Sequence, residues 1–393
     1  MDIELTVERI AVGGDAIAHE PAGRVVFVSG ALPGERVRAS VVSRGRDFWR
    51  ARTVEVLEAA AGRVEPSCPE VARGCGGCGW QYVAPEEQRS LKVAIVRDAL
   101  ARQGRLPGAE VHNGASVPPL GYRTTVRAGV TADGRLGLRR AASNEVLPLA
   151  ACPVAHPALS ALLGAVRAPH ADEVAVRVSE ATGERTLVVH AASDTDVRLE
   201  GVPRGVSVGR QERLTEVIEG QRLQVSAGSF FQSSAHSAVL LVDAVRRAVG
   251  DPSGISRWAD LYSGIGLFAA TLFRDVPVVT VEMSSSSVAD ARLNLVGREA
   301  LVIEGDVDEW DAERVDLVVA DPSRSGLGRN GVSVIARTGA QLLVLVSCDA
   351  ASLGRDAALL VAAGYRHAGS EVLDLFPQTP HVEVVTRFER VAD

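Results

Sequence analysis

The sequence predicts an α/β protein in three parts, each indicated by a different pattern of apolar residues, turns and cysteines. Residues 1–60 alternate short apolar segments with glycine-rich turns, which is typical of a small OB-like β-barrel. Residues 61–220 contain a cysteine-rich turn region followed mainly by alternating strands. Residues 221–393 alternate apolar strands with helical stretches, the pattern of a doubly wound, Rossmann-like parallel sheet.

The composition is that of a globular chain. With 393 residues, 46% of them apolar, it is long enough for two to three domains with ordinary buried cores. Met1 is followed by acids at Asp2 and Glu4, and no segment holds roughly 18 consecutive apolar residues. We therefore expect a soluble cytoplasmic protein without a membrane segment, and a monomer. Because the net charge is −7, any binding of nucleic acid has to depend on a local basic surface.

The first part of the chain has turn sequences of a recognisable kind. Alternating segments at Ile3–Ile10, Val25–Ser29, Arg36–Val42 and Ala51–Leu57 are predicted strands. The sequences that carry the resemblance are Gly13-Gly14-Asp15-Ala16, Gly23-Arg24-Val25-Val26-Phe27-Val28 and Ala31-Leu32-Pro33-Gly34-Glu35-Arg36-Val37. Over most of residues 1–58 the chain resembles a TRAM domain, an OB-like RNA-binding barrel. The resemblance implies a single-stranded nucleic acid ligand.

A basic stripe crosses the end of this region. Six arginines lie from Arg36 to Arg52, with Asp47 as the one acid inside that span. Aromatic residues lie among them, and such a combination can hold phosphates and stack on bases. The candidate RNA-binding residues are Arg44, Arg46, Phe48, Trp49 and Arg50. The alternative is a solvated strand edge whose arginines prevent aggregation.

The five cysteines divide into a set of four and one that stands apart. Cys75 and Cys78 are separated by two glycines, a spacing that lets both sulfurs face one metal, and Cys68 lies close by. Cys152 precedes a proline far along the chain, as a fourth ligand can. The spacing fits zinc as well as an iron-sulfur cluster, and Cys152 could instead be a buried structural thiol. Cys348 follows an apolar run and is a candidate nucleophile.

The central part contains one clear helix and several strands. Apolar residues recur at helical spacing from Pro85 to Gln103, and we expect this helix to pack on the C-terminal domain. Alternation predicts strands at Thr124–Val130, Val174–Val178 and Thr186–His190, with Asp133-Gly134 as a hairpin turn.

In the C-terminal part, one predicted strand after another ends in an acid, and in parallel sheets ligands bind at this end of the strands. The acids are Asp260, Glu282, Asp306 and Asp321, and the glycines of the first loop are Gly264 and Gly266. A carboxylate at Glu282 can accept both ribose hydroxyls of a nucleoside cofactor. A nicotinamide dinucleotide is the alternative, but a cationic sulfonium without phosphates suits an acidic pocket better. The pattern therefore favours S-adenosylmethionine.

Four further motifs complete a resemblance that spans nearly the whole chain. They are Ser229-Phe230-Phe231-Gln232, Asp260 to Gly266, Val346-Ser347-Cys348 and His381-Val382-Glu383. Together they resemble the RNA 5-methyluridine (uracil-C5) methyltransferases of the iron-sulfur-containing type with a TRAM domain. The resemblance implies S-adenosylmethionine as methyl donor, a structural 4Fe-4S cluster on Cys68, Cys75, Cys78 and Cys152, and an RNA substrate.

The resemblance also implies roles for individual residues. Cys348 would add to carbon 6 of uracil, so that carbon 5 becomes nucleophilic, and Glu383 would remove the proton from carbon 5 after methylation. Gln232, Tyr262 and Glu282 would contact the cofactor, Asp306 would lie at its adenine end, and Asp321 would lie near both uracil and cofactor. From the residues alone, His381 is expected to be a structural neighbour, and Phe230 and Phe231 to pack in the core.

Several positions depart from the family pattern. Ser323 and Ala350 stand where prolines are expected, Asp349 and Ser234 stand where asparagines are expected, and the first cysteine gap is one residue longer than the commonest form. An acid beside the nucleophile is expected to disfavour its anion. Ribosomal RNA is the favoured substrate, with transfer RNA as the alternative. A different kind of function, that of a non-catalytic RNA-binding protein, is a second alternative. A radical methylthiotransferase is excluded, because its cysteines need a three-residue gap before the final two-residue gap.

Overall fold

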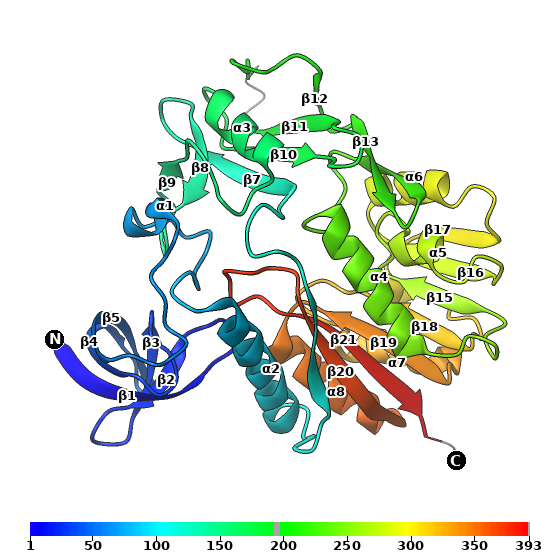
Figure 1. Cartoon of the computed structure of the whole chain (residues 1–393). Helices are drawn as coiled ribbons and strands as arrows, with labels where there is room; N and C mark the ends of the chain where they lie inside the picture. The colour runs from blue at the N-terminus through cyan, green and yellow to red at the C-terminus, as the bar shows by residue number, and fades with distance from the viewer. Residues whose placement is uncertain (192–196, 392–393) are drawn as a thin grey trace.

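The computed structural model describes residues 1–191 and 197–391, which form a barrel, a central sheet and a large C-terminal sheet covered by helices (Figure 1). Five strands close the barrel in the order β1-β2-β3-β5-β4. Alternate side chains such as Leu5 and Val7 are buried inside it. The short strand β2 was not predicted, because four residues show too little alternation to reveal a period. The bounds are β1 (Asp2–Ile10), β2 (Ala16–His19), β3 (Val25–Ser29), β4 (Arg36–Arg44) and β5 (Phe48–Glu58).

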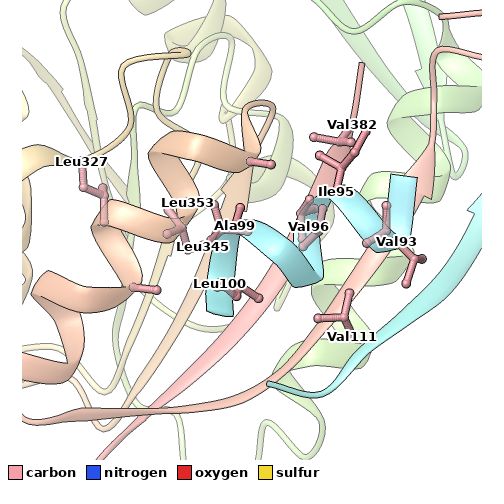
Figure 2. Close-up of a cluster of buried hydrophobic side chains, with 14 of the residues drawn as sticks. Val93, Ile95, Val96, Ala99, Leu100, Val111, Leu327, Leu345, Leu353 and Val382 are labelled. Atoms are coloured by element: carbon pink, nitrogen blue, oxygen red, sulfur yellow. The ribbon is translucent and has the colours of Figure 1, made fainter. Parts of the chain in front are cut away.

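A cysteine-rich loop and a long helix follow the barrel. The short helix α1 (Pro69–Ala72) begins directly after Cys68. Helix α2 (Pro85–Arg102) confirms the helix predicted from the apolar spacing, and it starts with a proline and two glutamates, which favour a helix N-terminus. It lies between the barrel and the C-terminal domain (Figure 1). Its apolar face packs mainly on α8 (Ala350–Ala362), β6 (Val111–Ser116) and β20 (Tyr365–Asp374), and Figure 2 shows Val96 and Ala99 of α2 together with Leu353 of α8.

The central domain is a six-stranded sheet with the order β12-β11-β10-β7-β8-β9, and a separate hairpin, β13-β14. The predicted strands are present, and Gly134 at φ 79° forms the turn between β7 and β8 as expected. Helix α3 packs its buried leucines against this sheet. The bounds are β7 (Thr125–Val130), β8 (Leu136–Arg139), β9 (Val146–Pro148), α3 (Pro157–Ala165), β10 (Glu173–Val178), β11 (Arg185–His190), β12 (Val206–Val208), β13 (Arg213–Ile218) and β14 (Gln221–Ser226).

The C-terminal domain has an eight-stranded sheet in the order β17-β16-β15-β18-β19-β21-β20-β6. Strands β15 to β19 are parallel, which confirms the doubly wound fold class, and β21 runs antiparallel to both β19 and β20. The bounds are β15 (Trp258–Leu261), β16 (Val278–Glu282), β17 (Ala300–Glu304), β18 (Leu317–Ala320), β19 (Leu342–Ser347), β20 (Tyr365–Asp374) and β21 (Glu383–Arg390). At one edge the sheet is extended by β6 (Val111–Ser116), which comes from the chain before the central sheet.

Helices follow the parallel strands and cover the sheet (Figure 1). The order of the strands reverses between β15 and β18, and ligands of such sheets bind at the carboxyl ends beside this point. Among the described residues, no helix combines the length and the apolar character that crossing a lipid bilayer requires. The helices of this domain are α4 (Ala235–Val249), α5 (Leu267–Thr271), α6 (Ser285–Asn294), the 3₁₀ turn η1 (Val307–Glu309), α7 (Gly328–Thr338) and α8 (Ala350–Ala362).

Candidate active site

A cavity of about 970 Å³ opens at the carboxyl ends of the parallel strands. Nine residues were predicted from the sequence to bind the cofactor or act in catalysis, and eight of them line this one cavity: Gln232, Tyr262, Gly264, Glu282, Asp306, Asp321, Cys348 and Glu383. Parallel strands deliver their ends to the same edge of a sheet, so residues spread over 150 positions meet there. The cavity is the candidate active site.

Gly266 is the predicted residue that does not line the cavity. It occupies the position before helix α5 with φ 79°, a left-handed conformation that glycine adopts without strain. A Cβ atom there would lie 3.4 to 3.5 Å from Leu295 and Ala291. Gly266 therefore shapes the loop and its packing. Tyr262 on the same loop has φ 58°, a rare conformation for a large residue and one that concentrates at functional sites.

Two carboxylates of the cavity are held by backbone amides. Glu282, at the end of β16, accepts hydrogen bonds from the N–H of Gly264 at 2.9 Å and the N–H of Ser284 at 2.7 Å. Asp306 accepts a hydrogen bond from the N–H of Asp308 at 3.0 Å. A carboxylate oxygen accepts more than one hydrogen bond, so both groups keep lone pairs for a ligand. This chemistry fits the hydroxyls and amine of a nucleoside.

Asp260 plays a different part, because it lies beneath the cavity. It is fully buried at the end of β15 and accepts a hydrogen bond from the N–H of Ala269 at 3.0 Å. Burial, together with the charges of Asp321 and Glu282, raises the pKa of Asp260 to about 8, against the hydrogen bond from Ala269. Asp260 therefore supports the glycine loop from inside the domain.

Cys348 follows the last parallel strand, β19, and lines the cavity half-buried. Burial, with a smaller contribution from the carboxylates of Glu383 and Asp321, raises the pKa of its thiol to about 11, and Arg324 acts in the opposite direction. The neighbouring Asp349 caps helix α8 by accepting a hydrogen bond from the N–H of Ser352 at 2.8 Å. Its carboxylate is therefore engaged by the helix N-terminus, and its expected effect on the thiolate stays a prediction.

Glu383 and Asp321 face the same space as Cys348. Glu383 is the first residue of β21 and is 4% exposed. Burial raises the pKa of Glu383 well above its ordinary value, the charge of Asp321 raises it further, and Arg324 lowers it. Burial likewise raises the pKa of Asp321 to about 7. The two buried carboxyls therefore compete for protons beside the thiol, and the Arg324 guanidinium favours their ionised forms.

Some residues of the cavity were missed or misjudged from the sequence. Phe230 was expected in the core, but its side chain is 71% exposed and lines the cavity, while Phe231 is 5% exposed as expected. Two adjacent phenylalanines cannot both face a core where the chain is extended, and this was the available signal. Arg324 also lines the cavity and was not among the predicted residues. His381 lines the cavity too, and burial lowers its pKa to about 4, so it is neutral near pH 7.

Two of the departures from the family pattern have local explanations. Ser234 begins helix α4, where its side chain accepts a hydrogen bond from the N–H of Ser237, and serine caps helices about as well as asparagine. Ser323 shares a hydrogen bond of 2.8 Å with the hydroxyl of Ser325. Neither change removes a charged side chain from the cavity.

A second, smaller cavity of about 200 Å³ is lined by Cys68, Cys75, Cys78 and Cys152. Burial raises the pKa of Cys78 to about 12, and the other three thiols contribute in the same direction. Among the described residues, no three His, Cys, Asp or Glu side chains stand close enough together to hold one metal ion. Four sulfurs on one zinc ion would lie roughly 4 Å apart, since each Zn–S bond is about 2.3 Å. Four cysteine thiolates are also the usual ligand set of a 4Fe-4S cluster.

The basic stripe forms one face of the barrel. The ring of Trp49 is in cation–π contact with two guanidinium groups, whose central carbons lie 5.0 Å (Arg24) and 4.9 Å (Arg44) from the ring centroid. Arg50 lies 5.6 Å from the ring of Phe27 and 5.7 Å from that of Phe48, in cation–π contact. Parallel pairing of β3 with β5 brings these side chains together. Arg24 and Phe27 were not predicted to belong to this surface, because the residue pattern of β5 does not reveal which strand pairs with it. The stripe also includes the exposed Arg46.

Comparisons with known proteins agree with this geometry. No protein-family model matches the chain. It is 34% identical to an RNA methyltransferase of Streptomyces avermitilis, covering 100% of this chain and 99% of the relative. It is also 34% identical to the 23S rRNA (uracil(1939)-C(5))-methyltransferase of Halomonas elongata, covering 98% and 89%. The tRNA (uracil-54, C5)-methyltransferase of Pyrococcus abyssi, solved with S-adenosyl-L-homocysteine, shares the fold with a TM-score of 0.75 at 21% identity, covering 98% of this chain and 100% of that one. The chain therefore belongs to the RNA methyltransferases, in the family that includes bacterial 23S rRNA uracil-C5 methyltransferases.

Proposed function

We propose that the protein methylates carbon 5 of a uridine in ribosomal RNA. The observation that carries the proposal is the shared cavity, in which a thiol, Cys348, and a buried carboxyl, Glu383, line the same space as the glycine loop and Glu282. S-adenosylmethionine, when bound, supplies an electrophilic methyl group. Gln232, Tyr262, Gly264 and Glu282 would hold it, with Asp306 at its adenine end.

The residues of the chain supply the remaining chemistry. The Cys348 sulfur forms a bond to carbon 6 of the uracil, which makes carbon 5 nucleophilic. After carbon 5 carries the methyl group, Glu383 takes its proton, the freed electron pair restores the double bond, and the sulfur leaves carbon 6 as a thiolate. Because the pKa of Cys348 is about 11, the free enzyme holds a thiol at neutral pH. Ionisation therefore has to accompany binding, and Arg324 is the cation in the cavity that favours the thiolate.

Ribosomal RNA is preferred over transfer RNA because relatives of 34% and 32% identity carry the name of 23S rRNA uracil-C5 methyltransferases. The direct test incubates the purified chain with 23S rRNA or tRNA transcripts and S-adenosylmethionine, followed by digestion and mass spectrometry. We expect 5-methyluridine in the ribosomal transcript. Its appearance in tRNA alone would reassign the substrate, and no methylated uridine in either RNA would support a non-catalytic RNA-binding protein.

Cofactor binding gives a prediction for Glu282. Replacing it by alanine removes a charged acceptor, and a hydrogen bond to a charged group contributes about 1.5–3 kcal/mol, so the affinity for S-adenosylhomocysteine should fall by roughly ten- to hundredfold. Isothermal titration calorimetry measures this. The matched control is Glu304→Ala: Glu304 pairs with Glu282 in the adjacent strand but does not line the cavity. An equal loss in both variants would contradict the assignment.

We further propose that Cys68, Cys75, Cys78 and Cys152 hold a 4Fe-4S cluster, in keeping with a reducing cytoplasmic location. The shared cavity and the chemistry of four thiols support this. Replacing Cys78 by serine should remove most of the iron and the visible absorption of anaerobically purified protein, and should lower its melting temperature. Metal analysis and electron paramagnetic resonance after reduction are the measurements, with Cys348→Ser as the matched control that keeps its iron. One equivalent of zinc in the unaltered protein would refute the cluster.

The barrel face is proposed as an RNA-binding surface that includes Arg44, Arg46, Phe48, Trp49 and Arg50. Stacking of a base on an aromatic ring contributes about 1–3 kcal/mol, so Trp49→Ala should weaken binding of a single-stranded RNA by roughly five- to a hundredfold. Fluorescence anisotropy at two salt concentrations measures the RNA affinity. Arg50→Ala should also weaken binding, and it should reduce the salt dependence of the affinity because a phosphate contact is lost. Arg135→Ala, on the central domain, is the control. If Trp49→Ala binds RNA like the unaltered protein, the stripe is only a solvated strand edge.

A further inference from the structure

The loop between β20 and β21, residues 375–382, forms one wall of the active-site cavity. Phe376, Thr379, His381 and Val382 line the cavity, and Glu383 follows immediately. Leu373 and Glu383 pair across the two strands, so the loop starts and ends beside the proposed base. Its conformation therefore decides how closely this wall covers Glu383 and Cys348.

Lys92 of helix α2 holds the first end of this loop. The lysine is 0% exposed, and its ammonium lies 2.6 Å from a carboxylate oxygen of Asp374 and 3.0 Å from the carbonyl oxygen of Phe376. Burial lowers the pKa of Lys92, and the Asp374 charge opposes this. A buried ion pair contributes little net stability compared with well-packed apolar side chains, so its presence calls for another reason.

Gln88, one helical turn earlier, holds the middle of the loop. Its side chain is 0% exposed and makes a reciprocal pair with Gln378: it accepts from the Gln378 N–H at 2.7 Å and donates to the Gln378 side-chain oxygen at 3.1 Å. The same amide also donates to the carbonyl oxygens of Val83 at 2.8 Å and Trp80 at 3.2 Å. Gln378 has φ 69°, a conformation that a non-glycine residue keeps only where its surroundings enforce it.

These polar contacts are not needed to attach helix α2. Its apolar face already packs on the C-terminal domain, and Ile95 lies beside Val382 in Figure 2. Positions 88 and 92 are spaced i, i+4 and so lie on one side of the helix, directed at two points of the same loop. Apolar packing therefore attaches the helix, and the polar contacts of Gln88 and Lys92 fix the conformation of the loop.

We propose that Gln88 and Lys92 are positioning residues for the release step, which hold the 375–382 loop closed over Glu383 and beside Cys348. The inference rests on the proposed function, since the release step is the transfer of the carbon 5 proton to Glu383 with breakage of the sulfur–carbon bond. Loosening the loop admits water to Glu383 and displaces the wall, and a displacement of about 1 Å can slow a step by roughly a hundredfold. Cys348 directly follows strand β19 and is not part of this loop, so the two residues do not set its position and formation of the adduct depends on them less.

The test compares Gln88→Leu and Lys92→Met with the unaltered protein on a 23S rRNA transcript. We expect methyl transfer in a single turnover to stay near the unaltered rate, while release slows by roughly ten- to a hundredfold. A covalent protein–RNA adduct carrying the methyl group should then accumulate on denaturing gels. The pH at which release is half-maximal should also fall, because a wetter Glu383 has a lower pKa. Tyr365→Phe, which removes a buried hydrogen bond at the far end of β20, is the control and should show neither effect.

A second variant separates positioning from stability. Lys92→Met leaves Asp374 buried without its partner and is expected to lower the melting temperature. The double variant Lys92→Met with Asp374→Leu removes that unpaired charge, so it should recover the melting temperature and still accumulate the adduct. Recovery of normal release together with stability would overturn the inference. The unaltered protein is tested in parallel on a 5-fluorouridine transcript. If it is trapped there, but the variants accumulate no adduct on ordinary uridine RNA, the inference is refuted and the proposed function stands. If the unaltered protein is not trapped, the proposed function is refuted and the inference with it.

Discussion

Replacing Cys348 by alanine is expected to lower RNA methylation to background, a loss on the order of 10⁴-fold or more, because covalent activation of carbon 5 has no substitute in the cavity. The measurement is transfer of labelled methyl groups from S-adenosylmethionine to a 23S rRNA transcript. The same variant should form no covalent complex with 5-fluorouridine RNA. In that analogue a fluorine replaces the proton that Glu383 would remove, so the adduct on the unaltered protein cannot be released.

The alanine variant should keep its fold and its cofactor site. Cys348 makes no hydrogen bond to another side chain among the described residues, and its loss leaves the Asp349 cap of helix α8 in place. Its melting temperature and its affinity for S-adenosylhomocysteine should therefore match those of the unaltered protein. Undiminished methylation by a well-folded Cys348→Ala variant would disprove the covalent mechanism.

Replacing Glu383 by glutamine is expected to separate the two halves of the reaction. Formation of the adduct and methyl transfer proceed, but removal of the carbon 5 proton loses its base, so turnover should fall by about 10²- to 10⁴-fold. With ordinary uridine RNA, the methylated adduct on Cys348 should then accumulate and be visible on a denaturing gel. Glutamine has nearly the shape of glutamate, so the change tests the proton acceptor more than the packing.

The pH dependence follows from the raised pKa of Glu383. A base acts in its ionised form, so the release rate should rise with pH through the pKa of Glu383, which burial places well above 4.5. Rapid-quench measurements of the release rate across pH report this rise, and the Glu383→Gln variant should no longer show it. The rate of adduct formation should rise separately at higher pH, because the free Cys348 thiol, whose pKa is about 11, attacks as a thiolate. Glu389→Gln, in the same strand, is the control, because Glu389 pairs with arginines outside the cavity. A normal turnover in Glu383→Gln would assign the base elsewhere.

Much of the site was predictable because its residues come at strand ends. Asp260, Glu282 and Asp321 each end a buried apolar strand, and the geometry of a parallel sheet brings such ends together whatever the intervening helices contain. Asp260 shows the limit of that reasoning. Its side chain turns inward and supports the glycine loop, which its position in the sequence alone does not reveal.

Residues whose partners lie far away in the sequence were not predictable. Gln88 and Gln378 are 290 positions apart, and the helical pattern around Gln88 carries no sign of that contact. Phe230 was expected in the core on its hydrophobicity, but the turn before helix α4 exposes it to the cavity. The cation–π pair of Arg24 with Trp49 likewise depends on parallel pairing of β3 with β5.

The doubly wound fold, the glycine loop, the candidate nucleophile Cys348 and the four-cysteine set could all be recognised in the sequence, because they depend on residue type and spacing along short segments. The proton affinities of the site could not, because they depend on the folded surroundings. The raised pKa of Cys348, Asp321 and Glu383 comes from burial and from mutual charge, and both are properties of the folded surroundings. The loop that covers Glu383 is likewise held by a helix from another part of the chain, since desolvation and long-range contacts exist only once the chain has folded.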